Sequence, residues 1–316
     1  MTLMPEQSLG QHSIEKPLQL DNSFFRIIAL GSFNHDNYQV RQNEQRTYSS
    51  NIQNDIRIVW QKVNKERGGN DMKVLTNDPQ LGLASIRVED GTIIFDTALS
   101  SYKDQIAWQD KEFRQKYPDF NPNILGTNIL IGTSDNKLMI VQRSFESATE
   151  PGTMSIAGGQ PDINNDCDEN GIWDPFKTVT RELEEETGVK KDELKEVEMK
   201  SVVFNKVANN PTVLFFAVTD LSSDEIKQRT TDREVNVRFI NDEQQKIEHT
   251  ILWWSSSKSP SGSSALSIYG SGKFGLDWLE KINNRLIRRD QRFYSKLSPS
   301  QLRSIVEKAS GNLSKK

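Results

Sequence analysis

Residues 181–189 are RELEEETGV, a run that holds four glutamates in nine positions. The run ends a predicted helix over about 175–187. Asp174 is a good N-cap in front of this helix, and Pro175 suits its first position. Gly188 is a natural stop, because glycine readily adopts the left-handed conformation that ends many helices. The side of the helix that we expect to be buried carries apolar residues at i, i+3 and i+7, which are Phe176, Val179 and Leu183.

The glutamates of this helix indicate a metal site. Glu182, Glu185 and Glu186 lie at i, i+3 and i+4, so they share one face. Like charges at this spacing destabilise a helix by roughly 0.2–0.5 kcal/mol per pair, and a hard divalent cation with oxygen ligands removes that repulsion. Arg181 stands beside them and is able to fix one carboxylate through a two-pronged contact. Acidic helical runs are more often solvated faces, so the spacing alone leaves both interpretations open.

Features upstream of this helix suit phosphate or nucleotide binding. Gly158 and Gly159 form a pair that permits a close backbone approach to phosphate. Arg143 ends an apolar strand predicted over 137–143, where its guanidinium suits phosphate, although an ordinary edge-strand arginine fits as well. Tyr102 is able to stack on a base, and packing inside the protein is the alternative.

In this order, the parts resemble the Nudix superfamily. The nine-residue run matches the second half of the Nudix box, Arg-Glu-apolar-x-Glu-Glu-x-Gly-apolar, at every specified position. Ala157-Gly158-Gly159 stands where that family often has Pro-Gly-Gly, and Pro151-Gly152 resembles the turn before it. The segment LMIVQR, residues 138–143, resembles the family's strand that ends in arginine.

The resemblance implies an α/β/α sandwich that hydrolyses a phosphoanhydride with Mg²⁺ or Mn²⁺. It implies that one glutamate of the box, or of a neighbouring loop, acts as general base. The implied metal ligands are Glu182, Glu185 and Glu186. The implied catalytic residues are Glu185, Glu186 and Arg181. The implied substrate-binding residues are Arg143, Gly158, Gly159 and Tyr102.

The chain departs from the Nudix pattern in the loop before the helix. Between Gly159 and Arg181 there are 21 residues where the family has about 13, so about eight are inserted within 160–173. The glutamate that normally precedes the box arginine by eight residues is absent, and Trp173 stands there. The acidic residues that could replace it are Glu169, Asp162 and Asp168, and the sequence does not choose among them.

Short motifs are similar to one branch, the UDP-glucose and UDP-galactose pyrophosphatases of animals. They are LSSYKD at 99–104, Leu125-Gly126, Arg143-Ser144 and GGQP at 158–161. That branch implies a domain ahead of the Nudix domain, with a helix that bears a buried tryptophan at Trp60. It also implies cleavage of a UDP-sugar to UMP and sugar 1-phosphate. Coenzyme A and ADP-ribose diphosphatases remain alternatives, as does a non-catalytic Nudix domain that binds a nucleotide.

The pattern of apolar residues and turns divides the chain into four parts. We expect a disordered tail over 1–19, a small α/β domain over 20–119, a Nudix domain over 120–300 and a C-terminal helix and tail over 301–316. The expected elements include a strand at 24–30, a loop over 34–54, a hairpin at Asp90-Gly91, a helix over 105–117, a flexible Ser-rich loop over 255–264 and a helix over 274–311.

Composition limits the kinds of partner. The net charge is −4, with 40 basic and 44 acidic residues, so no electrostatic argument favours nucleic acid. No apolar run reaches the ~18 residues of a membrane-spanning helix, and Cys167 is the single cysteine, which excludes an internal disulfide. We expect a cytoplasmic protein that acts on a nucleoside diphosphate-linked small molecule; the sequence leaves the oligomeric state open.

Overall fold

The computed structural model describes residues 24–43, 46–69, 75–143, 152–206, 208–230, 235–257 and 260–295. The tails expected at 1–19 and 301–316 lie outside these residues, as do Ser144 and Pro151. None of the helices in the described ranges is long and apolar enough to cross a membrane.

A mixed seven-stranded sheet forms the centre of the molecule, in the order β1-β8-β9-β5-β6-β10, with β7 paired to β6. The strands are β1 (Phe25–Phe33), β8 (Leu194–Asn205), β9 (Asn210–Thr219), β5 (Gly126–Gly132), β6 (Lys137–Arg143), β10 (Val235–Asn241) and β7 (Met154–Ser155). The pair β5–β9 is parallel and the other pairs are antiparallel.

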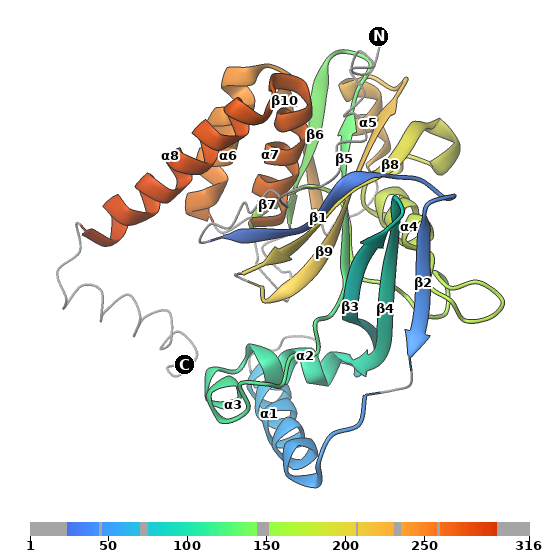
Figure 1. Ribbon diagram of the computed structural model, residues 1–316, viewed down its shortest axis with the longest axis vertical. Helices are drawn as coiled ribbons and strands as arrows, with labels where there is room; N and C mark the ends of the chain where they lie inside the picture. The colour runs from blue at the N-terminus through green and yellow to red at the C-terminus, as the bar shows by residue number, and fades with distance from the viewer. Residues whose placement is uncertain are drawn as a thin grey trace.

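Alternate residues of these strands enter two separate cores. Ile129 and Ile131 face the core shared with α4 (Pro175–Thr187) and α5 (Ser223–Arg229), whereas Leu130 faces the opposite core. That second core contains α6 (Gln244–Ser257), α7 (Pro260–Phe274) and α8 (Leu276–Ser295), which gather on one side of the sheet (Figure 1). Helices therefore cover both faces, and the predicted α/β/α sandwich is confirmed.

A smaller unit precedes β5 in the chain. Its three-stranded sheet has the order β2-β4-β3, formed by β2 (Tyr38–Asn43), β4 (Thr92–Ser101) and β3 (Pro79–Glu89). The helices α1 (Ser50–Gly68), α2 (Tyr102–Gln109) and α3 (Lys111–Lys116) share a separate apolar cluster. Asp90 and Gly91 join β3 to β4 with positive φ angles of 48° and 76°, which confirms the predicted hairpin.

Two expectations for the N-terminal part need correction. The strand expected at 24–30 is β1, but it pairs with β8, with Phe25 opposite Asn205, and so belongs to the large sheet. The loop expected over 34–54 contains β2, a polar edge strand in which Val40 is buried and its neighbours are not. A division into domains at residue 119 stays a prediction.

The flexible serine-rich loop expected over 255–264 is helical wherever it is described: residues 255–257 end α6 and residue 260 begins α7, with 258–259 outside the described ranges. Ser263, Ser264 and Ser267 are buried in this helix. The hydroxyls of Ser264 and Ser267 donate to the carbonyls of Ser261 and Ser263 at 2.8 and 2.7 Å. Serine hydroxyls can therefore be buried when the helix backbone itself supplies the acceptor.

One expected helix is divided into two. The segment 105–117 is interrupted at Asp110, which has ψ 128° and caps α3 by accepting from the Phe113 amide. The helix expected over 274–311 is observed as α8 from Leu276 to Ser295, and residues 296–311 lie outside the described ranges. It begins two residues later than expected, because Phe274 ends α7 and Gly275, with a φ of +88°, separates the two helices.

The small sheet packs on the helix that carries the glutamates. Phe95 of β4 contacts Trp173 edge to face, with ring centroids 5.9 Å apart. The Tyr38 hydroxyl donates to Asp174 Oδ1 at 3.1 Å, and His35 stacks on Phe176 with centroids 4.1 Å apart. Residues from both sides of position 119 thus fix the start of α4.

We predict that removing the N-cap of α4 destabilises the protein. Asp174 accepts from the Phe176 amide at 2.9 Å and the Lys177 amide at 3.4 Å as well as from Tyr38, so Asp174→Ala leaves three donors without this acceptor. The free energy of unfolding should fall by about 0.5–2 kcal/mol, measured by urea titration. Asp174→Asn is the matched control, because its amide oxygen still caps the helix; an equal loss in both variants contradicts the capping role.

Candidate active site

Helix α4 has the boundaries and the buried side that the sequence predicts. Asp174 is its N-cap, Pro175 begins it and Gly188 ends it in the left-handed conformation with φ 71°. A Cβ at position 188 would lie 2.6 Å from the Arg229 carbonyl oxygen, so glycine is required there for space as well as for φ. The apolar side chains at the predicted spacing are fully buried, namely Phe176, Val179 and Leu183.

Arg181 is the centre of an ion-pair network on this helix. Its Nε and Nη2 donate to the two carboxylate oxygens of Asp166 at 2.8 and 2.9 Å. Its Nη1 donates to Glu185 and its Nη2 to Glu182, both at 2.9 Å. The hydrogen bonds to Asp166, followed by the charges of Glu182 and Asp166, raise the pKa of Arg181 above its ordinary value. The two-pronged contact foreseen for Arg181 exists, but its partner is Asp166.

Asp166 is the site residue that the sequence did not reveal. Its side chain is 1% exposed, and it also accepts from the Asp162 amide at 2.8 Å. The acids considered for this loop, Asp162, Asp168 and Glu169, form no hydrogen bond with Arg181. The sequence spacing holds a signal for Asp166. The family's loop acid normally precedes the box arginine by eight residues, so an eight-residue insertion between the two would place the acid about sixteen residues before Arg181. Asp166 stands 15 residues before Arg181.

Trp173, at the position expected for the loop glutamate, has a structural role. It is 1% exposed and its indole Nε1 donates to the Thr178 hydroxyl at 2.8 Å. Together with its contact to Phe95, this side chain attaches the inserted loop to the small sheet.

Glu182 lies against the glycine pair. A Cβ at Gly159 would stand 2.2 Å from the Glu182 carboxyl carbon, so the glycine leaves room for the carboxylate in this position. Burial raises the pKa of Glu182 to about 7; Arg181 opposes this shift, and the negative charges of Glu185 and Asp166 add to it. The carboxylate is therefore poorly compensated by the protein alone, and a cation beside it would relieve that cost.

Glu186 holds the other glycine. Its Oε2 accepts from the Gly158 amide at 3.0 Å. Gly158 has φ 145°, and a Cβ there would stand 2.0 Å from the Thr127 carbonyl oxygen. Glycine is thus required at position 158 by the backbone, whereas at position 159 it leaves space for the Glu182 carboxylate.

The three predicted metal ligands do not face one space. Glu182 and Glu186 line a large pocket, whereas Glu185 is 57% exposed and lines a neighbouring hollow with Lys177 and Lys191. Within the described ranges, no group of three or more His, Cys, Asp or Glu side chains is arranged to hold a metal ion. Mg²⁺ is commonly bound by one or two carboxylates, with water and substrate phosphate completing its shell. The donor type of Glu182 and Glu186 fits that kind of site.

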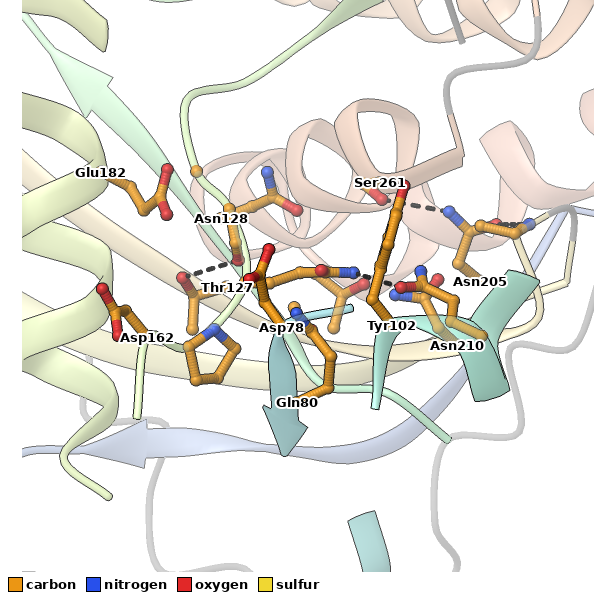
Figure 2. Close-up of a pocket in the computed structure, with 18 of the residues that line it drawn as sticks. Asp78, Gln80, Tyr102, Thr127, Asn128, Asp162, Glu182, Asn205, Asn210 and Ser261 are labelled. Carbon is orange, nitrogen blue, oxygen red and sulfur yellow. Dashed lines mark hydrogen bonds between the residues drawn. The ribbon is translucent and has the colours of Figure 1, made fainter. Parts of the chain in front are cut away.

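The large pocket has a volume of about 930 Å³ and lies between the two parts of the chain. Of the predicted substrate-binding residues, Tyr102, Arg143, Gly158 and Gly159 all line it. In Figure 2, Glu182, Thr127 and Asp162 lie at one end, and Tyr102, Asn205, Asn210 and Ser261 at the other. The structure thus joins an acidic end to an end rich in amides and hydroxyls. Of the residues at this second end, the sequence predicted Tyr102 but not Asn205, Asn210 or Ser261.

Tyr102 is packed as well as pocket-lining. Its ring meets Trp60 of α1 edge to face, at 6.3 Å between centroids and 87°. Burial raises the pKa of Tyr102, while the nearby Arg67 and Arg143 lower it and Asp78 raises it. Trp60 is half-buried, in partial agreement with the buried tryptophan implied at that position.

Comparisons with known proteins give only distant structural similarities. No family model matches the chain, and no curated protein matches it. Similar solved structures include an Ap4A hydrolase from C. elegans, with 14% identity over 46% of this chain and 96% of that chain and a TM-score of 0.33. Another is a MutT protein from Methanosarcina mazei, with 14% identity over 51% of this chain and 93% of that chain and a TM-score of 0.31.

A third similar structure is a bifunctional NMN adenylyltransferase/ADP ribose pyrophosphatase from Francisella tularensis. It is 16% identical over 52% of this chain and 45% of that chain, with a TM-score of 0.30. At these TM-scores, the chemistry of the site has to be argued from the residues of this chain.

We predict that the stability of the protein in EDTA depends on the ionisation of Glu182. Its folded pKa, about 7, exceeds the ordinary 4.5, so the folded state binds the proton more tightly. The stabilisation of the folded state that this tighter proton binding provides is complete below about pH 4.5 and is lost as the pH rises through about 7. Urea midpoints at pH 5 and pH 8 should differ more for the wild type than for Glu182→Gln, which does not titrate. Equal differences in the two proteins contradict the shifted pKa.

Proposed function

We propose that this chain is a Nudix-type hydrolase that cleaves the phosphoanhydride of a nucleoside diphosphate linked to a further group. The observation that carries the proposal is the contact of the α4 carboxylates with the glycine pair: Glu186 binds the Gly158 amide, and Glu182 lies against Gly159. This arrangement stands at the wall of a pocket whose size suits a nucleotide-linked ligand.

In this proposal, Glu182 and Glu186 hold Mg²⁺ or Mn²⁺. When bound, the cation supplies positive charge to phosphate oxygens as a Lewis acid. Arg181 keeps Glu182 in place, and Asp166 keeps Arg181 in place. Glu185 is assigned to Arg181 rather than to the cation, because it faces the neighbouring hollow.

The other side chains of the pocket are suited to different parts of the substrate. Arg143 ends β6 at the pocket wall, where its guanidinium suits the phosphate chain. Tyr102 and the amides of Asn205 and Asn210 suit a neutral, hydrogen-bonding group at the other end. For UDP-glucose or UDP-galactose, which the branch resemblance favours, the products are UMP and sugar 1-phosphate.

Nucleotide binding without hydrolysis is the second candidate. It is favoured by one observation: Glu185 contacts Arg181 and lines the neighbouring hollow instead of the large pocket. A binding-only protein retains nucleotide affinity and releases no phosphate monoester when Mg²⁺ or Mn²⁺ is added.

Adjacent glutamates provide a matched test of the metal assignment. Glu186→Gln should lower kcat by about a hundredfold, as expected for the loss of a key electrostatic contact. Glu185→Gln should cost less than about tenfold, because its carboxylate contacts Arg181 at a largely exposed position. Steady-state kinetics with Mg²⁺ measure both, and circular dichroism checks the fold. An equal loss in the two variants would mean that Glu185 is also a ligand, and full turnover in excess EDTA would overturn the metal mechanism.

A panel of substrates tests which group is linked to the nucleoside diphosphate. UDP-glucose, UDP-galactose, ADP-ribose and coenzyme A should be compared by kcat/KM with Mg²⁺ or Mn²⁺. We expect the UDP-sugars to be preferred, because the end of the pocket at Tyr102 offers neutral hydrogen-bonding groups from both parts of the chain. A tenfold preference for coenzyme A, about 1.4 kcal/mol in transition-state stabilisation, contradicts the UDP-sugar assignment and leaves the hydrolase assignment intact.

A further inference from the structure

One side-chain hydrogen bond joins the two walls of the pocket. Gln160 Nε2 donates to Gln105 Oε1 at 3.1 Å. Gln160 follows the glycine pair, whereas Gln105 belongs to α2 in the smaller unit, and both residues line the pocket. A ligand that extends from Glu182 toward Tyr102 therefore meets this pair of amides on its path.

Both amides stand on a fixed backbone. The backbone carbonyl of Gln160 accepts from Arg181 Nη2 at 3.2 Å, which ties this residue to the network of Asp166. Gln105 lies in the first turn of α2, next to the buried Asp104, which accepts from the Ser100 hydroxyl at 2.9 Å and the Ser101 amide at 3.0 Å. Amides held in this way lose little conformational freedom when they bind a ligand.

The mutual bond leaves one acceptor and one donor group for the pocket. A glutamine amide has one carbonyl and two N–H bonds. The pair uses the side-chain oxygen of Gln105 and one side-chain N–H of Gln160. Besides the second Gln160 N–H, this leaves two groups, the Gln105 NH₂ and the side-chain oxygen of Gln160. Neither of these two groups has a hydrogen-bond partner within the described ranges, and neither belongs to the buried atoms that lack one.

We propose that Gln105 and Gln160 form a specificity-determining pair that binds a hydroxyl of the group linked to the nucleoside diphosphate. A sugar hydroxyl accepts from the Gln105 NH₂ and donates to the side-chain oxygen of Gln160 at the same time. A site built to hydrogen-bond a hydroxyl discriminates against ligands that lack it, because its polar groups are then left unpaired. This inference rests on the proposed function and adds the chemical class that the far end of the pocket selects.

The test compares UDP-glucose with UDP, in which the same type of bond is cleaved but the sugar is missing. Gln105→Ala and Gln160→Ala should each lower kcat/KM for UDP-glucose about three- to tenfold and leave that for UDP within about twofold. The double variant should lose no more than about tenfold, because the two residues act together. Gln115→Ala is the matched control, since this glutamine on α3 is exposed and lies outside the pocket.

The variant Gln105→Glu distinguishes a role in ligand binding from a role limited to the hydrogen bond with Gln160. It keeps the oxygen that accepts from Gln160 and removes the NH₂ that faces the ligand. The UDP-glucose to UDP ratio of kcat/KM should fall as in Gln105→Ala. A wild-type ratio in Gln105→Glu, or equal losses on both substrates in every variant, overturns the inference while the proposed function stands.

If the wild type hydrolyses neither compound, the proposed UDP-sugar hydrolysis fails, and binding becomes the readout. Calorimetry in EDTA should then show UDP-glucose binding weakened three- to tenfold in Gln105→Glu with UDP binding unchanged. Unchanged UDP-glucose affinity, or no binding of either compound, overturns the inference as well.

Discussion

The contact on which the rest of the site depends is the paired hydrogen bond between Arg181 and the buried carboxylate of Asp166. A carboxylate with 1% exposure has lost its water, so it requires a partner of opposite charge with matching geometry. Arg181 is that partner: its Nε and Nη2 donate to Asp166. The same guanidinium also donates to Glu182, Glu185 and the backbone carbonyl of Gln160. One guanidinium thereby fixes the loop, the helix and the segment after the glycine pair relative to one another.

The small sheet and helices before β5 contribute to this site rather than standing beside it. Phe95 packs on Trp173 and Tyr38 bonds to Asp174, so the inserted loop and the N-terminus of α4 are held from outside the large sheet. Gln105 then reaches Gln160 across the pocket. The lengthened loop between Gly159 and Arg181 thus carries both the acid that anchors Arg181 and the tryptophan that attaches the loop to the small sheet.

Local features of the site followed from the sequence, and long-range ones did not. The bounds of α4 were predictable because a cap, a proline, an apolar stripe and a terminal glycine all act within a few residues. Asp166 was missed because loop geometry decides which of several acids reaches Arg181. The assignment of β1 to the large sheet depends on β8, about 170 residues later, and the burial of Ser263 depends on a helix packing against strands. Neither of these long-range contacts can be predicted from the residues of the segment alone.

The charges around Arg181 explain why the glutamates of one helix have different roles. Asp166, Glu182 and Glu185 share a single guanidinium, so one positive charge faces three carboxylates. Glu185 is largely exposed and water compensates it, whereas Glu182 is enclosed and its pKa rises to about 7. The site therefore concentrates uncompensated negative charge at Glu182, against Gly159, where neither water nor Arg181 suffices. Under the proposed function, a cation that arrives with a diphosphate would neutralise that position and would itself be neutralised by the phosphates, so metal and substrate would favour each other's binding at this one wall of the pocket.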